Sequence, residues 1–515
     1  MEKGQFLFLD WIILIVYLVG MVLIGLKLAG KQTTTKEYFK ADKQMHWFPV
    51  SLSVIATLFS GVSFIGQPAR VFRYDTALIA FTFSVILITP IVNYVLLPFY
   101  SKLDVTTAYE YLEKRFSLNV RLVASALFIL RRLFWMALVA LAPSLALSAM
   151  TGIKVEYCIL IIGVIATIYA SLGGTSAVIW TDVIQFVIFM AGQVIIICFV
   201  AGKLDGGFGE IWRVGLASGD KLPSMDFDFS RLTFWTMLIA GCALALSDLG
   251  ADQLTVQRLM AAKDLRRARI SMVFNALWKI PSMTILLGMG VALWAFYKEY
   301  PHLLKLDPKE YDKIVPYFVI NELPVGISGL VIAAIFSAAM SSFSSGLNCL
   351  VTTFTVDWYK RLLKPAQEDK QYLVLAKGLS FVLGVSITIL AVLFYRTGIE
   401  SIIDKSNEYL GYFGGALLGI FLLGVFTRRT KALPTVLASI LTVALLFALN
   451  YYQSGRKSFI IHPYMYCFLG AAMTMILGYM GSLFGPELPF EGIRNYTLAG
   501  KRQITSDTIS VGRST

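Results

Sequence analysis

The chain has 515 residues, of which 57% are hydrophobic and 15% charged, and its mean hydropathy is +0.70. These values exceed those of an ordinary soluble domain and predict a polytopic membrane protein in contact with lipid. The formal net charge of +13 does not indicate a nucleic-acid partner, because Lys and Arg stand in short clusters between apolar runs and form no basic domain.

Long apolar runs follow one another along the whole chain. At roughly 20 residues per span, they predict about thirteen transmembrane helices in an all-α fold. The expected spans are 8–29, 47–72, 76–100, 120–150, 155–172, 175–201, 232–256, 267–297, 325–358, 372–396, 407–426, 431–450 and 463–485. The first run has neither a basic flank nor a small-residue cleavage site, so we expect a retained helix and not a signal peptide.

Basic residues are concentrated in alternate loops. These loops lie near 31–43, 114–121, 263–269, 360–370 and 428–431, and the short loops of the other set hold few such residues. Since cytoplasmic loops are enriched in Lys and Arg, we expect the N-terminus outside, the tail after Gly485 in the cytoplasm, and a multi-pass protein of the plasma membrane. The long outer segments, 203–230 and 298–324, are expected to be ordered loops with short helices.

Two of the expected spans contain helix-breaking sequences. The second span includes SVIATLFSGVSFIGQP, residues 53–68, with two glycines and a proline, and the seventh includes SDLGADQ, residues 247–253, with two acids and a glycine. Broken helices five spans apart indicate a transporter built from inverted repeats, with its site near the middle of the membrane. The repeats would then be spans two to six and seven to eleven.

A serine-rich patch lies inside the ninth span. In FSAAMSSFSSGLN, residues 336–348, helical spacing places Ser341, Ser344 and Ser345 on one face with Ser342 beside them. Such a cluster of neutral oxygens suits a weakly held alkali cation. The alternative is that these small residues only allow close helix packing.

An acid near the start of the sixth span, Asp182, is the natural partner of this patch. It is either a cation ligand or a charge at the membrane interface. One carboxylate with several hydroxyls makes a plausible sodium site, and Ala56 and Phe59 at the first break could offer backbone carbonyls to a neighbouring one.

Two arginines, Arg131 and Arg132, lie in the middle of the fourth span, where a charge must be paired or hydrated. They could neutralise Asp248 and Asp252, or bind an anionic substrate; Arg131 shares a helix face with Trp135. The remaining polar candidates in apolar surroundings, Gln67 and Thr82 among them, are either substrate ligands or interhelical hydrogen bonds.

Enzyme chemistry is not indicated. The sequence lacks a phosphate-binding loop, an HExxH zinc motif and a nucleophile elbow. The five cysteines form no spaced pair, so neither a disulfide framework nor a cysteine metal site is predicted.

Several long motifs in order resemble the sodium:solute symporter family. They are IYASLGGTSAVIWTDVIQ (168–185), GGALLGIFLLGVFTRR (414–429), AYEYLEKRF (108–116), VQRLMAAKD (256–264) and AAIFSAAMSSFSSGLN (333–348). The resemblance covers essentially the whole chain and implies a LeuT-like fold that works by alternating access. The implied organisation is a leading helix and loop (1–45), a first inverted repeat (46–202), an outer loop (203–230), a second repeat (231–428), two trailing helices (429–485) and a cytoplasmic tail (486–515).

The resemblance also implies sodium sites. In family members the shared site uses carbonyls of the broken first core helix and hydroxyls of the eighth, which correspond here to Ala56, Phe59, Ala338, Ser341 and Ser342. A second site, present in sialic acid transporters, would use Asp182, Ser341, Ser344 and Ser345. All these residues are present, so two sodium ions per cycle are expected.

The resemblance leaves the substrate open. SFIGQPARVFRYD is similar to the monocarboxylate, iodide and vitamin branch, except that Arg70 stands where that branch has an acid. The arginine that holds sialic acid's carboxylate would fall at Trp135, and the neighbouring glutamine at Thr82. We expect a small organic anion such as a monocarboxylate or sugar acid, with a sugar or polyol as the alternative. The expected substrate-binding residues are Ser60, Ser63, Gln67, Thr82, Arg131, Trp135 and Asp248.

A membrane solute sensor on the same fold is the alternative of another class. Such sensors carry a signalling domain, and the tail after Gly485 is too short for one. An ion channel fits the broken helices less well than alternating access does.

Overall fold

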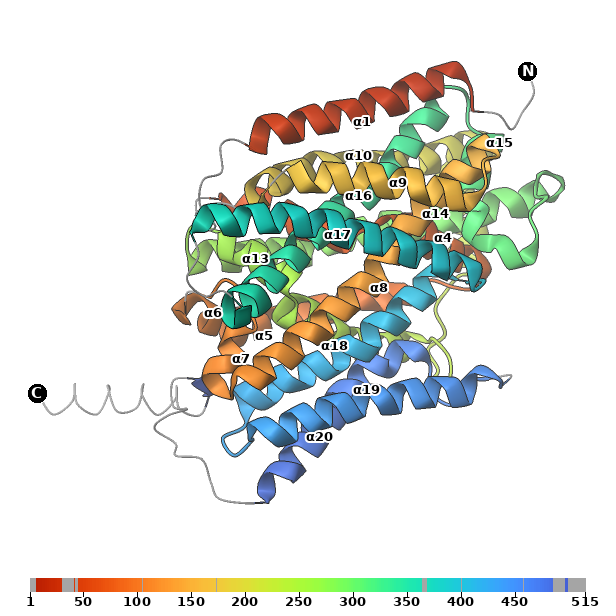
Figure 1. Cartoon of the computed structure of the whole chain (residues 1–515). Helices are drawn as coiled ribbons and strands as arrows, with labels where there is room; N and C mark the ends of the chain where they lie inside the picture. Colours follow the sequence, from red (N-terminus) through yellow and green to blue (C-terminus); the bar gives the residue numbers. More distant parts are fainter. Residues whose placement is uncertain are drawn as a thin grey trace, which may run out of the picture.

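A computed structural model describes residues 6–29, 41, 45–103, 105–172, 174–363, 368–399, 401–456, 458–484 and 496–498, and these residues form a bundle of helices (Figure 1). Within them, eleven helices are long and apolar enough to cross a membrane, or up to twelve if a bent pair is counted as one span. The helix of the fifth expected span, α9 (Val155–Leu172), is too short to be counted among them. The all-α prediction is confirmed, and the count of about thirteen is approximate.

Most expected spans correspond to continuous helices. They are α1 (Phe8–Ala29), α5 (Ala80–Ile91) continued by α6 (Leu97–Leu103), α8 (Leu118–Thr151), α9 (Val155–Leu172), α10 (Thr175–Lys203), α14 (Leu265–Glu299), α16 (Ile327–Thr353), α17 (Asp369–Arg396), α18 (Ile402–Phe426), α19 (Ala432–Ser454) and α20 (Tyr466–Leu483). The expected spans miss the true ends by a few residues. Helix α18 begins five residues early, because Ser401 caps its N-terminus by accepting a hydrogen bond from the Asp404 amide.

The two long loops contain short helices, as predicted. These are α11 (Gly207–Trp212) with a π-helical turn (Arg213–Ala217) in the first loop, and 3₁₀ turns (Pro301–Leu303 and Pro308–Lys313) with α15 (Ile314–Asn321) in the second. A further short helix, α7 (Glu110–Arg115), precedes α8.

The second span is broken where the sequence predicts it. Helix α3 (Trp47–Leu58) and helix α4 (Gly61–Arg73) meet at an angle of 56°. Phe59 and Ser60 between them are extended, and Ser60 and Ser63 bond to each other's backbone amide in a reciprocal cap of α4. Gly61 allows the break to approach α16, since a Cβ there would lie 3.1 Å from the Ala339 Cβ.

The seventh span is also broken. Helix α12 (Phe234–Leu246) ends in a π-helical turn (Ser247–Ala251), Asp252 is extended, and α13 (Gln253–Ala261) follows. The Asp252 side chain caps α13 by accepting a hydrogen bond from the Leu254 amide. Both predicted interruptions are therefore confirmed, and each leaves backbone groups outside the helical pattern.

Helix α16 is the centre of the bundle, and the outer helices present apolar faces. The most apolar window of α16 is 89% buried, against 22% for α1, 33% for α17 and 28% for α19. Figure 1 shows α1 along one edge and α19 and α20 along the opposite edge. Asp10 of α1 fixes the N-terminus of α16 by accepting hydrogen bonds from the amides of Gly326 (2.7 Å) and Gly329 (2.8 Å).

Candidate functional site

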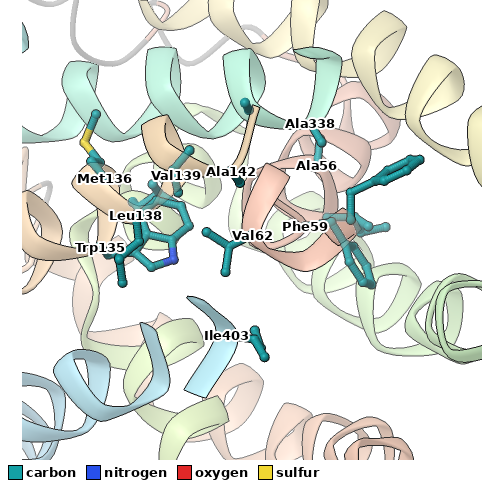
Figure 2. Close-up of a cluster of buried hydrophobic side chains, with 14 of the residues drawn as sticks. Ala56, Phe59, Val62, Trp135, Met136, Leu138, Val139, Ala142, Ala338 and Ile403 are labelled. Carbon is teal, nitrogen blue, oxygen red and sulfur yellow. The ribbon is translucent and has the colours of Figure 1, made fainter. Parts of the chain in front are cut away.

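The first break lies against the serine patch of α16. The Ser341 hydroxyl donates to the carbonyls of Ala56 (3.3 Å) and Ala338 (3.1 Å), and the Ser342 hydroxyl lies 3.5 Å from the Phe59 carbonyl. Figure 2 shows Ala56 facing Ala338. The tertiary structure thus brings together all five residues expected at the first sodium site.

The spacing of these oxygens suits a small hard cation. Hydroxyl hydrogen bonds are usually closer, at about 2.7–2.8 Å. Ca²⁺, which is close to Na⁺ in radius, takes oxygen ligands at roughly 2.3–2.6 Å, so neighbouring ligand oxygens around such an ion are separated by roughly 3.3–3.7 Å. The observed separations of 3.1–3.5 Å are near this range, and Ser341 and Ser342 are fully buried.

Asp182 lies in a second polar cluster on the same side of α16. Its carboxylate accepts hydrogen bonds from Ser345 (3.1 Å) and Ser53 (2.6 Å) and is 3.5 Å from the Arg258 guanidinium. Ser344 instead donates to the carbonyl of Ser341 (3.2 Å). The structure therefore joins Asp182 and Ser345, while Ser341 and Ser344 direct their hydroxyls to backbone carbonyls.

Sequence reasoning missed Ser53 and Arg258 in this cluster. Arg258 is buried in α13 and also donates to Ser53 (2.9 Å) and to the Leu254 carbonyl (2.9 Å). Because the Arg258 guanidinium neutralises the Asp182 carboxylate, Asp182 is not an isolated negative charge. The sequence carries no clear signal for Arg258, because it follows the seventh expected span (232–256) and stands next to Gln257.

A cavity of about 80 Å³ lies beside the first break. Five of the seven expected substrate-binding residues line it: Ser60, Ser63, Gln67, Trp135 and Asp248. Further polar residues from α14, α18 and the start of the last span complete the wall: Lys279, Ser406, Asn407 and Tyr464. Figure 2 shows Trp135 of α8 next to Val62, and both line the cavity together with Ile403. Thr82 and Arg131 are not among its lining residues.

Arg131 lies in a buried ion-pair network instead. It pairs with both Asp248 and Asp252, and Arg132 pairs with Asp252 at 2.7 Å. Gly414 makes room for it, since a Cβ there would lie 2.9 Å from the Arg131 Nε. The two arginines and the two aspartates of this network balance in charge, so Arg131 has no free positive charge to offer a substrate. The geometry therefore favours a structural ion pair over the substrate contact that was expected for Arg131.

Lys279 was also missed from the sequence. It is 4% exposed, and its Nζ lies 3.9 Å from the centre of the Phe59 ring and 5.1 Å from that of Phe81. A position close to the face of an aromatic ring favours a cation, because that face carries partial negative charge. The rule that identified Arg131, a charge in the middle of an apolar span, applies equally to Lys279 within 267–297.

A larger cavity of about 640 Å³ adjoins this one at Tyr464, and an ion pair lies at its wall. Arg70 of α4 donates to both oxygens of Asp404 of α18 (2.8 and 2.7 Å), and its guanidinium lies over the Tyr464 ring at 5.7 Å. Tyr464 lines both cavities, and Asp404 and His462 line the larger one. Burial, and then Arg70, lowers the pKa of His462 to about 4, so that it is neutral at physiological pH.

The comparisons with known proteins agree with this geometry. The model of the sodium:solute symporter family matches residues 38–441. The chain is 32% identical to the sodium/sialic acid symporter SiaT of Proteus mirabilis over 94% of this chain and 97% of that one. It is also 32% identical to the sodium-coupled monocarboxylate transporter 1 of Homo sapiens, over 84% and 72% of the two chains.

A solved structure of a Na⁺-coupled sialic acid symporter, in a substrate-bound outward-open state, superposes with a TM-score of 0.85. It is 30% identical and matches over 94% of this chain and all of that one. The fold is thus LeuT-like, as expected. Because the family model covers most of the chain and the relatives extend over nearly all of it, this chain belongs to the sodium:solute symporter family and is a sodium-coupled solute symporter.

Proposed function

We propose that the chain uses the sodium gradient to take up a small organic anion. The observation that carries this proposal is the contact between the serines of α16 and the carbonyls at the first break, directly beside a polar cavity. Relatives named for sialic acid and for monocarboxylates support an acid as the solute. A sugar or polyol is the alternative.

Sodium would bind to the carbonyls of Ala56, Phe59 and Ala338 and the hydroxyls of Ser341 and Ser342. An ion there holds the broken helix α3–α4 against α16 and so stabilises the conformation in which these oxygens converge. Substrate then binds in the adjoining cavity, next to Ser60 and Ser63 at the start of α4. Coupling requires that sodium binds the two conformations with different affinities, since equal affinity shifts no population.

A second sodium ion would bind near Asp182, with Ser341, Ser344 and Ser345 as the expected ligands. The hydroxyls of Ser341 and Ser344 would have to rotate away from the carbonyls that they now contact. Arg258, at 3.5 Å from Asp182, would be the competing cation. Two sodium ions per cycle are therefore proposed, with Arg258 setting the affinity of the second.

The proposed setting is the plasma membrane, with the N-terminus outside and the C-terminus in the cytoplasm. The larger cavity, next to the C-terminal end of α4, would then face the outside. Residues 46–202 and 231–428 would be the two inverted repeats, each beginning with one of the broken helices.

The test is uptake by proteoliposomes with and without an imposed sodium gradient. The panel contains lactate, pyruvate, sialic acid, glucose, myo-inositol and proline. Sodium-dependent accumulation of an acid supports the proposal, and accumulation of only glucose or myo-inositol supports the alternative. Solute binding without any flux would identify a sensor.

A further inference from the structure

Lys279 is the one lysine or arginine among the residues lining the smaller cavity. Within the described part of the chain, it forms no ion pair and no hydrogen bond with another residue. A buried ammonium without a direct ion pair is costly. Two aromatic rings compensate in part, because each offers a negative face to the cation.

The other buried cations near the substrate path already have carboxylate partners. Arg131 and Arg132 pair with Asp252, Arg131 also with Asp248, and Arg258 with Asp182. Asp248 lines the cavity but is held by Arg131. Lys279 is therefore the one cation among the residues that line this cavity, and no carboxylate of the described residues forms an ion pair with it. Asp248 in the same wall attracts it electrostatically but is bonded to Arg131.

From this geometry we infer that Lys279 binds the carboxylate of the transported acid. The inference rests on the proposed function and specifies its substrate. A carboxylate at Lys279 could also accept hydrogen bonds from the hydroxyls of Ser60 and Ser63, which line the same cavity. The residue that binds the carboxylate is thus on α14. It is not at position 135 of α8, where the resemblance to sialic acid transporters places the carboxylate-binding arginine and this chain has tryptophan.

The cavity limits the size of that acid. One bound water needs roughly 10–15 Å³ of cavity volume. Counting each non-hydrogen atom of the acid as one water, a cavity of about 80 Å³ holds roughly five to eight such atoms. Lactate and pyruvate have six. Sialic acid is several times larger, and Trp135 fills part of the wall. The substrate class is therefore a small monocarboxylate.

Lys279 also links the acid to sodium. Its Nζ lies on the ring of Phe59, and the carbonyl of the same residue faces Ser342 at the sodium site. An unpaired ammonium opposes a second cation nearby, and a bound carboxylate removes this repulsion. The acid therefore raises the affinity for sodium, and by reciprocity sodium raises the affinity for the acid.

The test compares Lys279→Met and Lys279→Gln with the wild type and with Lys298→Met. Lys298 is the matched control, because it lies on the same helix but forms an exposed ion pair with Asp220. Two readouts are used: uptake of lactate and pyruvate into proteoliposomes, and the sodium concentration for half-maximal thermal stabilisation, with and without lactate. Lactamide serves as the neutral analogue of lactate.

In the wild type and in Lys298→Met, we expect lactate to lower the half-maximal sodium concentration at least fivefold and lactamide to have no effect. In both Lys279 variants, acid uptake falls at least tenfold, and lactate no longer changes the sodium dependence. Sodium alone still stabilises these variants, which shows that they are folded.

Retained lactate uptake and a retained lactate effect in either Lys279 variant would overturn the inference. So would lactamide competing as well as lactate in the wild type, a result that needs no variant. These outcomes differ from failure of the proposed function, in which the wild type itself shows no sodium-dependent uptake of any solute.

Discussion

Ser342→Ala tests the first sodium site with the least disturbance. The Ser342 side chain is fully buried, and its hydroxyl makes one contact, 3.5 Å to the Phe59 carbonyl. Alanine fits the same space on a helix, and the lost hydrogen bond is long and weak. The fold should therefore be kept, while sodium loses one of five oxygens.

A hydrogen-bonding group that contacts a charged partner contributes about 1.5–3 kcal/mol. At about 1.4 kcal/mol per factor of ten, removing it should raise the sodium concentration for half-maximal uptake by roughly 10- to 100-fold. Maximal uptake at saturating sodium should change little. Ser341→Ala should have a larger effect, because that hydroxyl contacts two carbonyls.

The assay is initial uptake of the transported acid into proteoliposomes over a sodium titration. Ser337→Ala is the control, since it removes a buried hydroxyl from the same helix, one that donates to the Gln185 carbonyl at 2.8 Å. If Ser342→Ala changes the half-maximal sodium concentration less than twofold, or no more than Ser337→Ala does, Ser342 is not a sodium ligand.

Three further predictions concern carboxylates. Asp182→Asn should reduce the cooperativity of the sodium titration toward one ion; unchanged cooperativity would contradict a second site there. Asp252→Asn leaves Arg131 with only Asp248 and Arg132 without its ion pair. The substitution should therefore lower the free energy of unfolding by about 3–5 kcal/mol, measured by thermal unfolding. A loss under about 1 kcal/mol would refute the role of this network. Burial, and then Asp404, raises the pKa of Asp312 in the second long loop to about 7. The folded state therefore binds more protons than the unfolded state between about pH 4 and 7, so stability falls as pH rises through this window. Asp312→Asn should be more stable than the wild type above pH 7 but not below pH 4, and an equal difference at both would contradict the shift.

The helical architecture could be predicted because membrane spans are local. About twenty apolar residues in a row must form a helix in lipid, where no water satisfies the backbone, so α8, α10 and α14 were evident from composition. The breaks were also local, since Gly61 and the acids of SDLGADQ disfavour a continuous apolar helix. Of the five residues expected at the first sodium site, Ser341, Ser342, Ala56 and Phe59 were already indicated by the serine spacing and the helix break, and the resemblance added Ala338. The structure brings their oxygens within 3.5 Å of one another in pairs.

Only the tertiary structure decided which buried basic residue pairs with which carboxylate. The sequence predicted that Arg131 must find a partner or a cavity at membrane depth, and the same rule applies to Lys279 within 267–297. It did not determine that Arg131 would meet two aspartates, that Arg258 would meet Asp182, or that Lys279 would be left facing a cavity. Pairing depends on how α8, α13 and α14 rotate about their axes when they pack, and a rotation that brings one charge to its partner turns another away.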